Sequence, residues 1–280
     1  MLDSMSLGIA FKGPEGVVLA ADSRVTLFAE RRNEDTGRFD VFPSSFDNAT
    51  KVLEFDGHSH IAAVTYGLGA LGAKSPRTAH SFTPELEAEF SENLRRNPDA
   101  DSQSVEEYAR QLGAFFMRQW AEQGMPPPNE YSGEPMIFQV GGFNDGEPYG
   151  RVYDVIVPFR PDPMEQNPDS FGVTWGGQGE AVARLIVGFD DRLVAAVSKI
   201  LGLAEDANSD LFRRLKSELH PPIPYQFLSL QDSVDFCCML IRTTMQFQRF
   251  QVGVRGVGGA IDVAVITRTS GLRHIRRKVV

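Results

Sequence analysis

Two short apolar runs near the start of the chain constrain the fold more than any other feature. The runs Leu7 to Lys12 and Gly16 to Ala21 are separated by Gly13-Pro14-Glu15, a sequence typical of a tight turn. They therefore predict a β-hairpin. The second run is almost free of polar residues, which is typical of a strand that is covered on both faces. The chain is thus expected to bury this hairpin between further layers of structure.

A hydroxyl residue, Ser6, stands directly before the first run, and Asp22 directly follows the second. If the five leading residues are removed, Ser6 gains a free α-amine, whose ordinary pKa of about 8 allows it to act as a base toward the neighbouring hydroxyl. One residue then serves as both nucleophile and general base. Ser4 is a weaker candidate, because it lies two residues out of this spacing. Without that chemistry, Ser6 is a polar residue that begins an edge strand.

The stretch from Ser6 to Arg24 resembles the opening of proteasome β-type subunits, a family of N-terminal-nucleophile (Ntn) hydrolases. In that family a terminal Thr precedes two strands, and the second strand ends in Ala-Ala-Asp-x-Arg. Here Ser6 takes the place of the Thr, and the residues that follow at the same spacing are Ala20, Ala21, Asp22 and Arg24. Two later segments resemble the family in the same order. Lys51 to Phe55 resembles its strand with the catalytic lysine, and Ala63 to Gly69 resembles its strand and glycine beside the substrate cleft.

The resemblance implies roles for five residues. Ser6 would be the nucleophile, and Lys51 would stabilise the negative charge that develops on its hydroxyl, while Asp22 keeps Lys51 charged. Thr26 and Gly67 match positions that bind a substrate backbone as an added strand, and Gly67 also matches a donor of the oxyanion hole. Without the resemblance, Lys51 is a lysine at the exposed start of a strand, and Asp22 is a turn former. Thr26 and Gly67 are then a β-former and a packing glycine.

The resemblance also implies the fold, which would be α+β, a four-layer αββα sandwich of the Ntn-hydrolase type. Blocks of predicted strands and blocks of predicted helices agree with two sheets that are covered by helices. We expect a short leader or propeptide over residues 1–5 and a single domain over residues 6–280. Insertions are expected near 28–48, as a loop or hairpin, and near 204–226, with one short helix, because the sequence becomes polar or charged there.

Local patterns predict the other elements. Thr83-Pro84-Glu85 is expected to cap one helix, and Ser104 with Glu107 to cap a second, whose apolar face ends at Trp120. Ser229 with Asp232 predicts a long helix to about residue 250. The remaining predictions are strands over 51–55, 61–66, 137–143, 150–158 and 171–175, a helix from about 180 and a closing strand over 258–266. The basic residues after 272 are expected to form a solvated end.

One segment departs from the family. Catalytic β-type subunits have an aspartate and, three residues later, a serine before a Gly-Gly pair, and these groups help to orient the terminal amine. Here Val254 and Val257 stand at those positions, before Gly258-Gly259. Gln178, in a glycine-rich loop, is an alternative group for orienting the amine. The same departure also suits a subunit that has the fold but no catalytic role.

The composition argues against several other functions. The 280 residues carry a formal net charge of -9, which is unsuited to binding a nucleic-acid backbone. No apolar run of about 18 residues and no signal-peptide pattern occurs, so a cytoplasmic protein without a membrane partner is expected. Cys237-Cys238 are expected to be buried, and His58 and His60 to be exposed turn residues, rather than metal ligands. No metal or organic cofactor is expected.

These features predict a proteasome-like Ntn hydrolase that cleaves peptide (amide) bonds through an acyl-Ser6 intermediate. Its substrates would be peptides or unfolded proteins, although related folds hydrolyse other small amides. A homo-oligomeric ring is expected, with apolar helices such as Val105 to Trp120 as contact surfaces, and the sequence does not specify whether an ATPase is a partner. The alternative is a non-catalytic ring subunit of the same fold.

Overall fold

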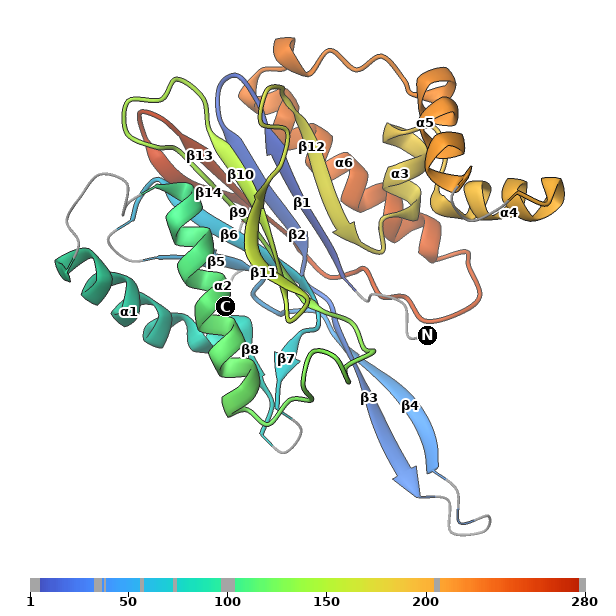
Figure 1. Ribbon diagram of the computed structural model, residues 1–280, viewed down its shortest axis with the longest axis horizontal. Helices are drawn as coiled ribbons and strands as arrows, with labels where there is room; N and C mark the ends of the chain where they lie inside the picture. Colours follow the sequence, from blue (N-terminus) through green and yellow to red (C-terminus); the bar gives the residue numbers. More distant parts are fainter. Residues whose placement is uncertain are drawn as a thin grey trace.

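A computed structural model describes residues 6–32, 37, 39–55, 58–72, 75–96, 104–203 and 207–276 of the chain. It is 36% helical and 30% strand, which confirms the predicted α+β class. Most of its strands belong to two five-stranded antiparallel sheets (Figure 1). The predicted leader over residues 1–5 lies outside the described residues.

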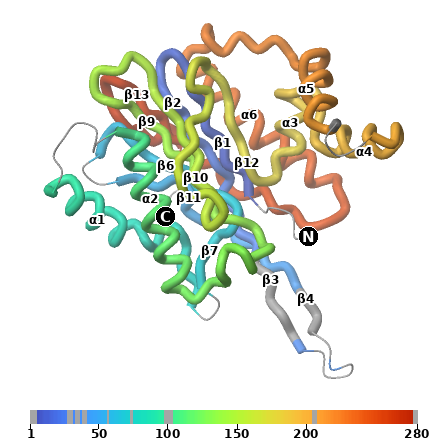
Figure 2. Tube along the Cα trace, viewed as in Figure 1, coloured from blue at the N-terminus to red at the C-terminus, as the bar shows by residue number. Residues whose placement is uncertain are grey.

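The first sheet contains the N-terminal hairpin. Its strand order is β12-β1-β2-β13-β14, with the bounds Gly172–Gly177, Leu7–Lys12, Val17–Asp22, Ile261–Thr267 and Gly271–Arg276. A hydrogen bond from Gly13 N to Gly16 O, 2.9 Å long, closes the turn between β1 and β2. Every residue of these two strands is buried, so the predicted hairpin and its coverage are confirmed. In Figure 2, β2, near the start of the chain, lies beside β13, near its end, and the two strands pair.

The second sheet packs with its inner face on the first. Its strand order is β11-β10-β9-β6-β5, with the bounds Arg160–Glu165, Arg151–Val157, Met136–Gly142, Ile61–Gly67 and Val52–Glu54. Small and branched side chains from both sheets share one core cluster, which includes Ala62 and Val64 of the second sheet and Val17 and Leu19 of the first. These small side chains allow the sheets to approach closely over the hairpin.

Helices pack on the outer faces of both sheets (Figure 1). Their bounds are Thr83–Arg96 (α1), Val105–Glu122 (α2), Glu180–Ile186 (α3), Asp191–Leu201 (α4), Ala207–Leu219 (α5) and Leu230–Gln248 (α6). The helices α1 and α2 share a core cluster with the second sheet, in which Phe116 packs on Phe138. The helices α3 and α6 share another cluster with the first sheet, which α4 and α5 join through Val194 and Phe212.

The apolar face of α2 is not available for contacts between subunits. Its residues Val105, Tyr108, Leu112, Phe116 and Trp120 are all buried in the core cluster against the second sheet. That part of the assembly prediction is wrong, because the face that the apolar spacing reveals is the face that the chain covers with its own sheet.

Two of the three predicted helix caps are present. Ser104 Oγ accepts a hydrogen bond from Glu107 N at the start of α2, and Ser229 with Asp232 forms a capping box at the start of α6. Thr83, in contrast, does not cap α1. A 3-10 turn, η1 (Ala79–Phe82), runs directly into this helix, so that Thr83 already has helical angles of φ -53° and ψ -44°. Thr78 caps the turn instead, by accepting a hydrogen bond from Ser81 N.

Two edge strands were not predicted. Pro161 and Pro163 argue against a strand in the sequence, yet β11 includes both, because proline is tolerated at the edge of a sheet. The strand β14 is the second. Its basic residues were expected to form a solvated end, but they belong to a strand that pairs with β13. The predicted closing strand is therefore followed by one more.

A two-stranded hairpin overlaps the first predicted insertion. Here β3 (Val25–Arg32) pairs with β4 (Phe39–Phe46) and extends away from the two larger sheets (Figure 1). The helix α5 occupies the second predicted insertion. The remaining short elements are β7 (Ala70–Leu71), β8 (Arg77–Thr78) and the 3-10 turn η3 (Tyr225–Phe227).

Candidate active site

Three of the predicted site residues meet where the two sheets pack together. Ser6 directly precedes β1, Asp22 is the last residue of β2, and Lys51 directly precedes β5 of the other sheet. Lys51 Nζ donates to Ser6 Oγ over 3.0 Å and to Asp22 Oδ1 over 2.6 Å. The exposed fractions of Ser6, Asp22 and Lys51 are 5%, 0% and 4%. Lys51 is thus not an exposed residue at the start of a strand, and its ammonium links the hydroxyl to the carboxylate.

Asp22 is held by backbone groups as well as by Lys51. Its Oδ1 also accepts a hydrogen bond from Leu7 N over 3.0 Å. Its Oδ2 accepts from Arg24 N over 3.1 Å and from Gly258 N over 3.0 Å. A buried carboxylate is costly unless it is paired and hydrogen-bonded, and this set of donors offsets the cost of burying Asp22. The carboxylate therefore fixes the end of β2, the start of β1 and the ammonium of Lys51 relative to one another.

A cavity of about 170 Å³ opens beside Ser6 and Lys51. Most of its lining residues are small or apolar: Ser6, Val25, Ala49, Thr50, Lys51, Thr65, Tyr66, Gly67, Leu68, Gly69, Thr78, Ala79 and His80. The cavity joins the hydroxyl to the end of β6, where Thr65 N donates to Lys51 O over 2.8 Å. A buried hydroxyl, an ammonium and an adjoining cavity are the parts that an attack on a bound carbonyl requires.

Gly67 lines this cavity, and its position requires glycine. Its φ is +82°, and a Cβ atom added there would lie 2.2 Å from Pro135 O. Thr26, the other predicted substrate-binding residue, is not among the lining residues, although its neighbour Val25 is. The Thr26 hydroxyl lies 3.0 Å from that of Ser45, across the β3–β4 hairpin. The structure thus places Gly67 in the lining of the cavity, and Thr26 next in sequence to a lining residue but outside the lining itself.

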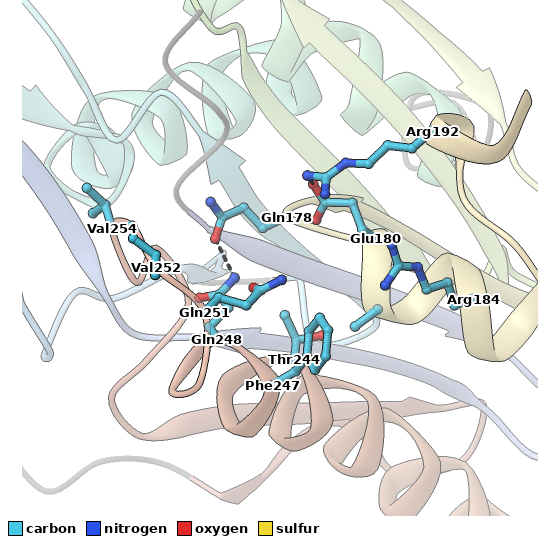
Figure 3. Close-up of a pocket in the computed structure, with 12 residues that line it drawn as sticks. Gln178, Glu180, Arg184, Arg192, Thr244, Phe247, Gln248, Gln251, Val252 and Val254 are labelled. Carbon is cyan, nitrogen blue, oxygen red and sulfur yellow. Dashed lines mark hydrogen bonds and ion pairs between the residues drawn. The ribbon is translucent and has the colours of Figure 1, made fainter. Parts of the chain in front are cut away.

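A chain of amide groups lies on another side of Ser6. Gln178 N donates to Ser6 O over 2.8 Å, which continues the pairing of β1 with β12 by one residue. The Gln178 side chain accepts at Oε1 from Gln248 Nε2 over 2.6 Å, as Figure 3 shows. Gln248 Oε1 in turn accepts from Val257 N over 3.1 Å. Val257 is 2% exposed, so this valine takes part through its backbone and is otherwise a core residue.

The two glutamines form part of the wall of a second cavity, of about 240 Å³ (Figure 3). Val254 lies on its rim and is 41% exposed. Two arginines also line it, and both are paired with carboxylates: Arg184 with Asp190 over 2.6 Å and Arg192 with Glu180 over 3.3 Å. Val254 and Val257 are thus apolar residues that lie near the amide side chains of Gln178 and Gln248.

Sequence reasoning missed two residues of this region. The sequence predicts Tyr66 only as part of an apolar strand, and Gln248 only as part of the end of a long helix. The signal for Tyr66 was a bulky ring directly before a glycine with a predicted role. For Gln248 there was no signal, because its partner Gln178 lies 70 residues away in the sequence.

The cysteines and histidines have other surroundings. Cys237 and Cys238 are buried in α6, as predicted, and burial raises the pKa of both thiols. The prediction that His58 and His60 are exposed is wrong, because both are half-buried. His58 packs against Tyr108, and burial lowers its pKa. Within the described ranges no three His, Cys, Asp or Glu side chains gather as metal ligands would. No helix in the same ranges is long and apolar enough to cross a bilayer.

Comparisons with known proteins found a similar fold among solved structures. No protein-family profile matches the sequence, and no curated protein matches it either. Among solved structures, the chain is similar to a Gly-1 mutant of Anbu from Hyphomicrobium sp. strain MC1, with a TM-score of 0.52 and 16% sequence identity. The similarity covers 98% of this chain and 86% of that one. At this level of identity the likeness concerns the fold, which the chain shares with that Anbu structure.

Proposed function

We propose that the protein is a proteasome-like Ntn hydrolase that cleaves amide bonds with Ser6 as its N-terminal nucleophile. The observation that carries the proposal is the position of Lys51 Nζ, within hydrogen-bond distance of both Ser6 Oγ and Asp22 Oδ1. Loss of Met1 to Met5 would give Ser6 the free amine that this chemistry needs. The proteasome-like fold supports the same assignment.

In this mechanism the Ser6 amine takes the proton from Oγ, and Oγ attacks the carbonyl carbon of the substrate. The Lys51 ammonium stabilises the negative charge on Oγ, and a backbone N–H at Gly67 stabilises the oxyanion of the tetrahedral intermediate. The protonated amine then gives its proton to the departing nitrogen as the C–N bond breaks, which leaves an ester on Ser6. Water, activated by the same amine, adds to the ester and forms a second tetrahedral intermediate. Collapse of this intermediate releases the acid and restores the Ser6 hydroxyl.

The finer features of the fold and substrate belong to the same proposal. Residues 6–280 form one domain, a four-layer αββα sandwich, with 28–48 and 204–226 as insertions. Peptides or unfolded proteins bind as an extended strand near Thr26 and Gly67, with a side chain in the cavity beside Ser6. The subunits form a homo-oligomeric ring in the cytoplasm. The largely apolar lining of the cavity favours peptides with apolar side chains over charged small amides.

A trapping experiment tests the proposal. Purified protein is first examined by N-terminal sequencing and intact mass, which should show Ser6 as the first residue. A peptide epoxyketone or β-lactone should then add covalently to Ser6. Ser6→Ala should prevent labelling, and Ser6→Thr should retain it, because hydroxyl and amine are both kept. A protein that still begins at Met1 and nevertheless hydrolyses peptides would contradict the mechanism.

The second candidate function is a non-catalytic ring subunit. It is favoured by Val254 and Val257, which replace the polar groups that help to orient the amine in the family. The same experiment separates the two candidates. A correctly processed Ser6 that reacts with none of several peptide epoxyketones would favour the non-catalytic subunit.

A further inference from the structure

One aromatic ring of the second sheet fills a gap in the first. Gly8 of β1 and Gly176 of β12 lie directly opposite each other. A Cβ atom added at Gly8 would lie 2.1 Å from Tyr66 Cδ1, and one added at Gly176 would lie 2.3 Å from Tyr66 Cε2. The Tyr66 ring therefore occupies the space of two absent side chains. No side chain larger than hydrogen fits at either position while the ring stays in place.

The ring lies between the groups of the candidate active site. Gly8 is two residues beyond Ser6, which directly precedes β1, so the ring lies against the segment that carries the hydroxyl. Tyr66 itself directly precedes Gly67, and it follows Thr65, whose N–H binds the carbonyl oxygen of Lys51. Tyr66 also lines the cavity beside Ser6. One residue thus contacts the strand of the nucleophile and belongs to the strand of the candidate oxyanion donor.

The phenol is not suited to proton transfer. Tyr66 is 4% exposed, and burial, together with the nearby Asp154, raises the pKa of its hydroxyl well above the ordinary value. The hydroxyl therefore stays protonated near neutral pH. What Tyr66 contributes to the site is the shape and stiffness of its ring.

We propose that Tyr66 is a positioning residue, whose ring sets the distance between the Ser6 hydroxyl and the Gly67 backbone by seating in the gap at Gly8 and Gly176. This inference rests on the proposed function. A nucleophile and an oxyanion donor that come from different sheets need such a spacer, because a displacement of about 1 Å is enough to lower turnover about 100-fold. At Gly8 and Gly176, β1 and β12 have no side chains of their own that could hold that distance.

Two tyrosines of the second sheet provide a matched comparison. Tyr153, on β10, is also 4% exposed, but it belongs to the core under α2 and not to the cavity. Tyr66→Leu should lower kcat for a peptide substrate at least about tenfold and change KM by less than about threefold, because binding groups remain while alignment is lost. The rate at which a peptide epoxyketone labels Ser6 should fall in parallel. Tyr66→Phe, which keeps the ring, should restore both rates to within about threefold of the wild type.

Tyr153→Leu is the control for loss of a buried ring. It should lower the melting temperature as Tyr66→Leu does, but leave kcat within about threefold of the wild type. If Tyr153→Leu and Tyr66→Leu lower kcat equally, Tyr66 is a core residue only and the inference is wrong. If Tyr66→Phe is as slow as Tyr66→Leu, the phenol acts chemically, and a positioning role for the ring is likewise wrong.

A double-mutant cycle tests the contact itself. Gly8→Ala should slow labelling of Ser6 in the wild type, because the new methyl group displaces the ring, and should have little effect in Tyr66→Ala. Additive effects of the two substitutions would overturn the inference. If the wild type itself is correctly processed but neither hydrolyses peptides nor is labelled, the proposed function fails, and the positioning role fails with it. An active wild type with an indifferent Tyr66 rejects the positioning role alone.

Discussion

Lys51 Nζ lies 2.6 Å from Asp22 Oδ1, in a site where both side chains are almost completely buried. A buried charge is stable only when it is paired and hydrogen-bonded, because the water that it loses must be replaced. Three backbone N–H groups complete the coordination of the carboxylate. The position of the ammonium beside the Ser6 hydroxyl therefore depends on Asp22, which holds Lys51.

Removal of the ammonium should abolish turnover in a protein that still folds, although it loses stability because Asp22 is left without its counter-charge. Lys51→Ala is expected to lower kcat/KM for a peptide at least about 100-fold, because the charge that develops on Ser6 Oγ loses its stabilising partner. Lys12→Ala is the matched control, since Lys12 is 5% exposed and its Nζ binds the carbonyl oxygens of Asn167 and Pro168, away from Ser6. Steady-state kinetics and circular dichroism of both variants check this. Equal activity of Lys51→Ala and the wild type would make Lys51 a structural residue.

Removal of the charge on Asp22 should affect both activity and stability. Asp22→Asn replaces one carboxylate oxygen, which accepts hydrogen bonds, with an amide nitrogen, which cannot accept them, and it leaves Lys51 without its counter-charge. Breaking a buried ion pair in this way costs about 3–5 kcal/mol of unfolding free energy. Asp47→Asn, in the partly exposed pair of Asp47 with Arg24, should cost less than about 1 kcal/mol. Urea unfolding measures both, and a small loss for Asp22→Asn would show that the pair contributes little.

The sequence predicted what is local and missed what depends on how the sheets pack. The β1–β2 hairpin follows from two apolar runs and one turn, and α6 follows from its capping box and apolar spacing. Ser6, Asp22 and Lys51 were grouped through a resemblance, and the geometry then brought them within hydrogen-bond distance. Spacing alone does not reveal that grouping, because Lys51 comes from the other sheet.

The contacts of Tyr66 were beyond local reasoning for the same reason. They depend on how β6 of the second sheet packs on β1 and β12 of the first. The edge strands β11 and β14 were missed because residues that are excluded from central strands are tolerated at the edge of a sheet. Proline is tolerated in β11, and alternation of buried and exposed residues in β14 is masked by its basic side chains.

Assembly should be visible in solution. The structure leaves several large apolar side chains exposed near the end of α6, among them Phe250 at 86% and Phe247 at 46%. Soluble monomers rarely expose such groups together, which agrees with subunit contacts in a ring. Light scattering should give a multi-subunit mass at micromolar concentration. Phe250→Ser should reduce that mass more than Phe227→Ser, which removes a ring that is 80% exposed just before the start of α6. A stable monomer would count against the ring.

A carboxyl group of the second sheet, near Tyr66, should make stability depend on pH. Asp154 of β10 lies opposite Gln139 of β9 in the second sheet. Its Oδ1 is buried and has no hydrogen-bond partner among the described residues. Burial raises the pKa of Asp154 to about 6, and a hydrogen bond from Gln139 and the charge of Arg160 oppose that rise only in part. In the folded protein this carboxyl therefore holds its proton to a higher pH than in the unfolded chain.

The sign of the effect follows from that difference. Between the ordinary pKa of 3.8 and the raised value of about 6, the folded state binds more protons, so stability falls as the pH rises through this window. Above it the ionised group costs about 3 kcal/mol, because a shift of one pKa unit corresponds to about 1.4 kcal/mol. Asp154→Asn, which is neutral throughout, should therefore be more stable than the wild type at pH 8 by up to that amount, and equally stable near pH 4.

Asp162→Asn, an exposed change on the adjacent strand β11, is the control and should shift stability by less than about 0.5 kcal/mol at either pH. Urea unfolding from pH 4 to pH 8 measures both differences. A gain for Asp154→Asn that is the same at every pH would mean that Asp154 does not ionise in this window, and its burial would then contribute through packing alone.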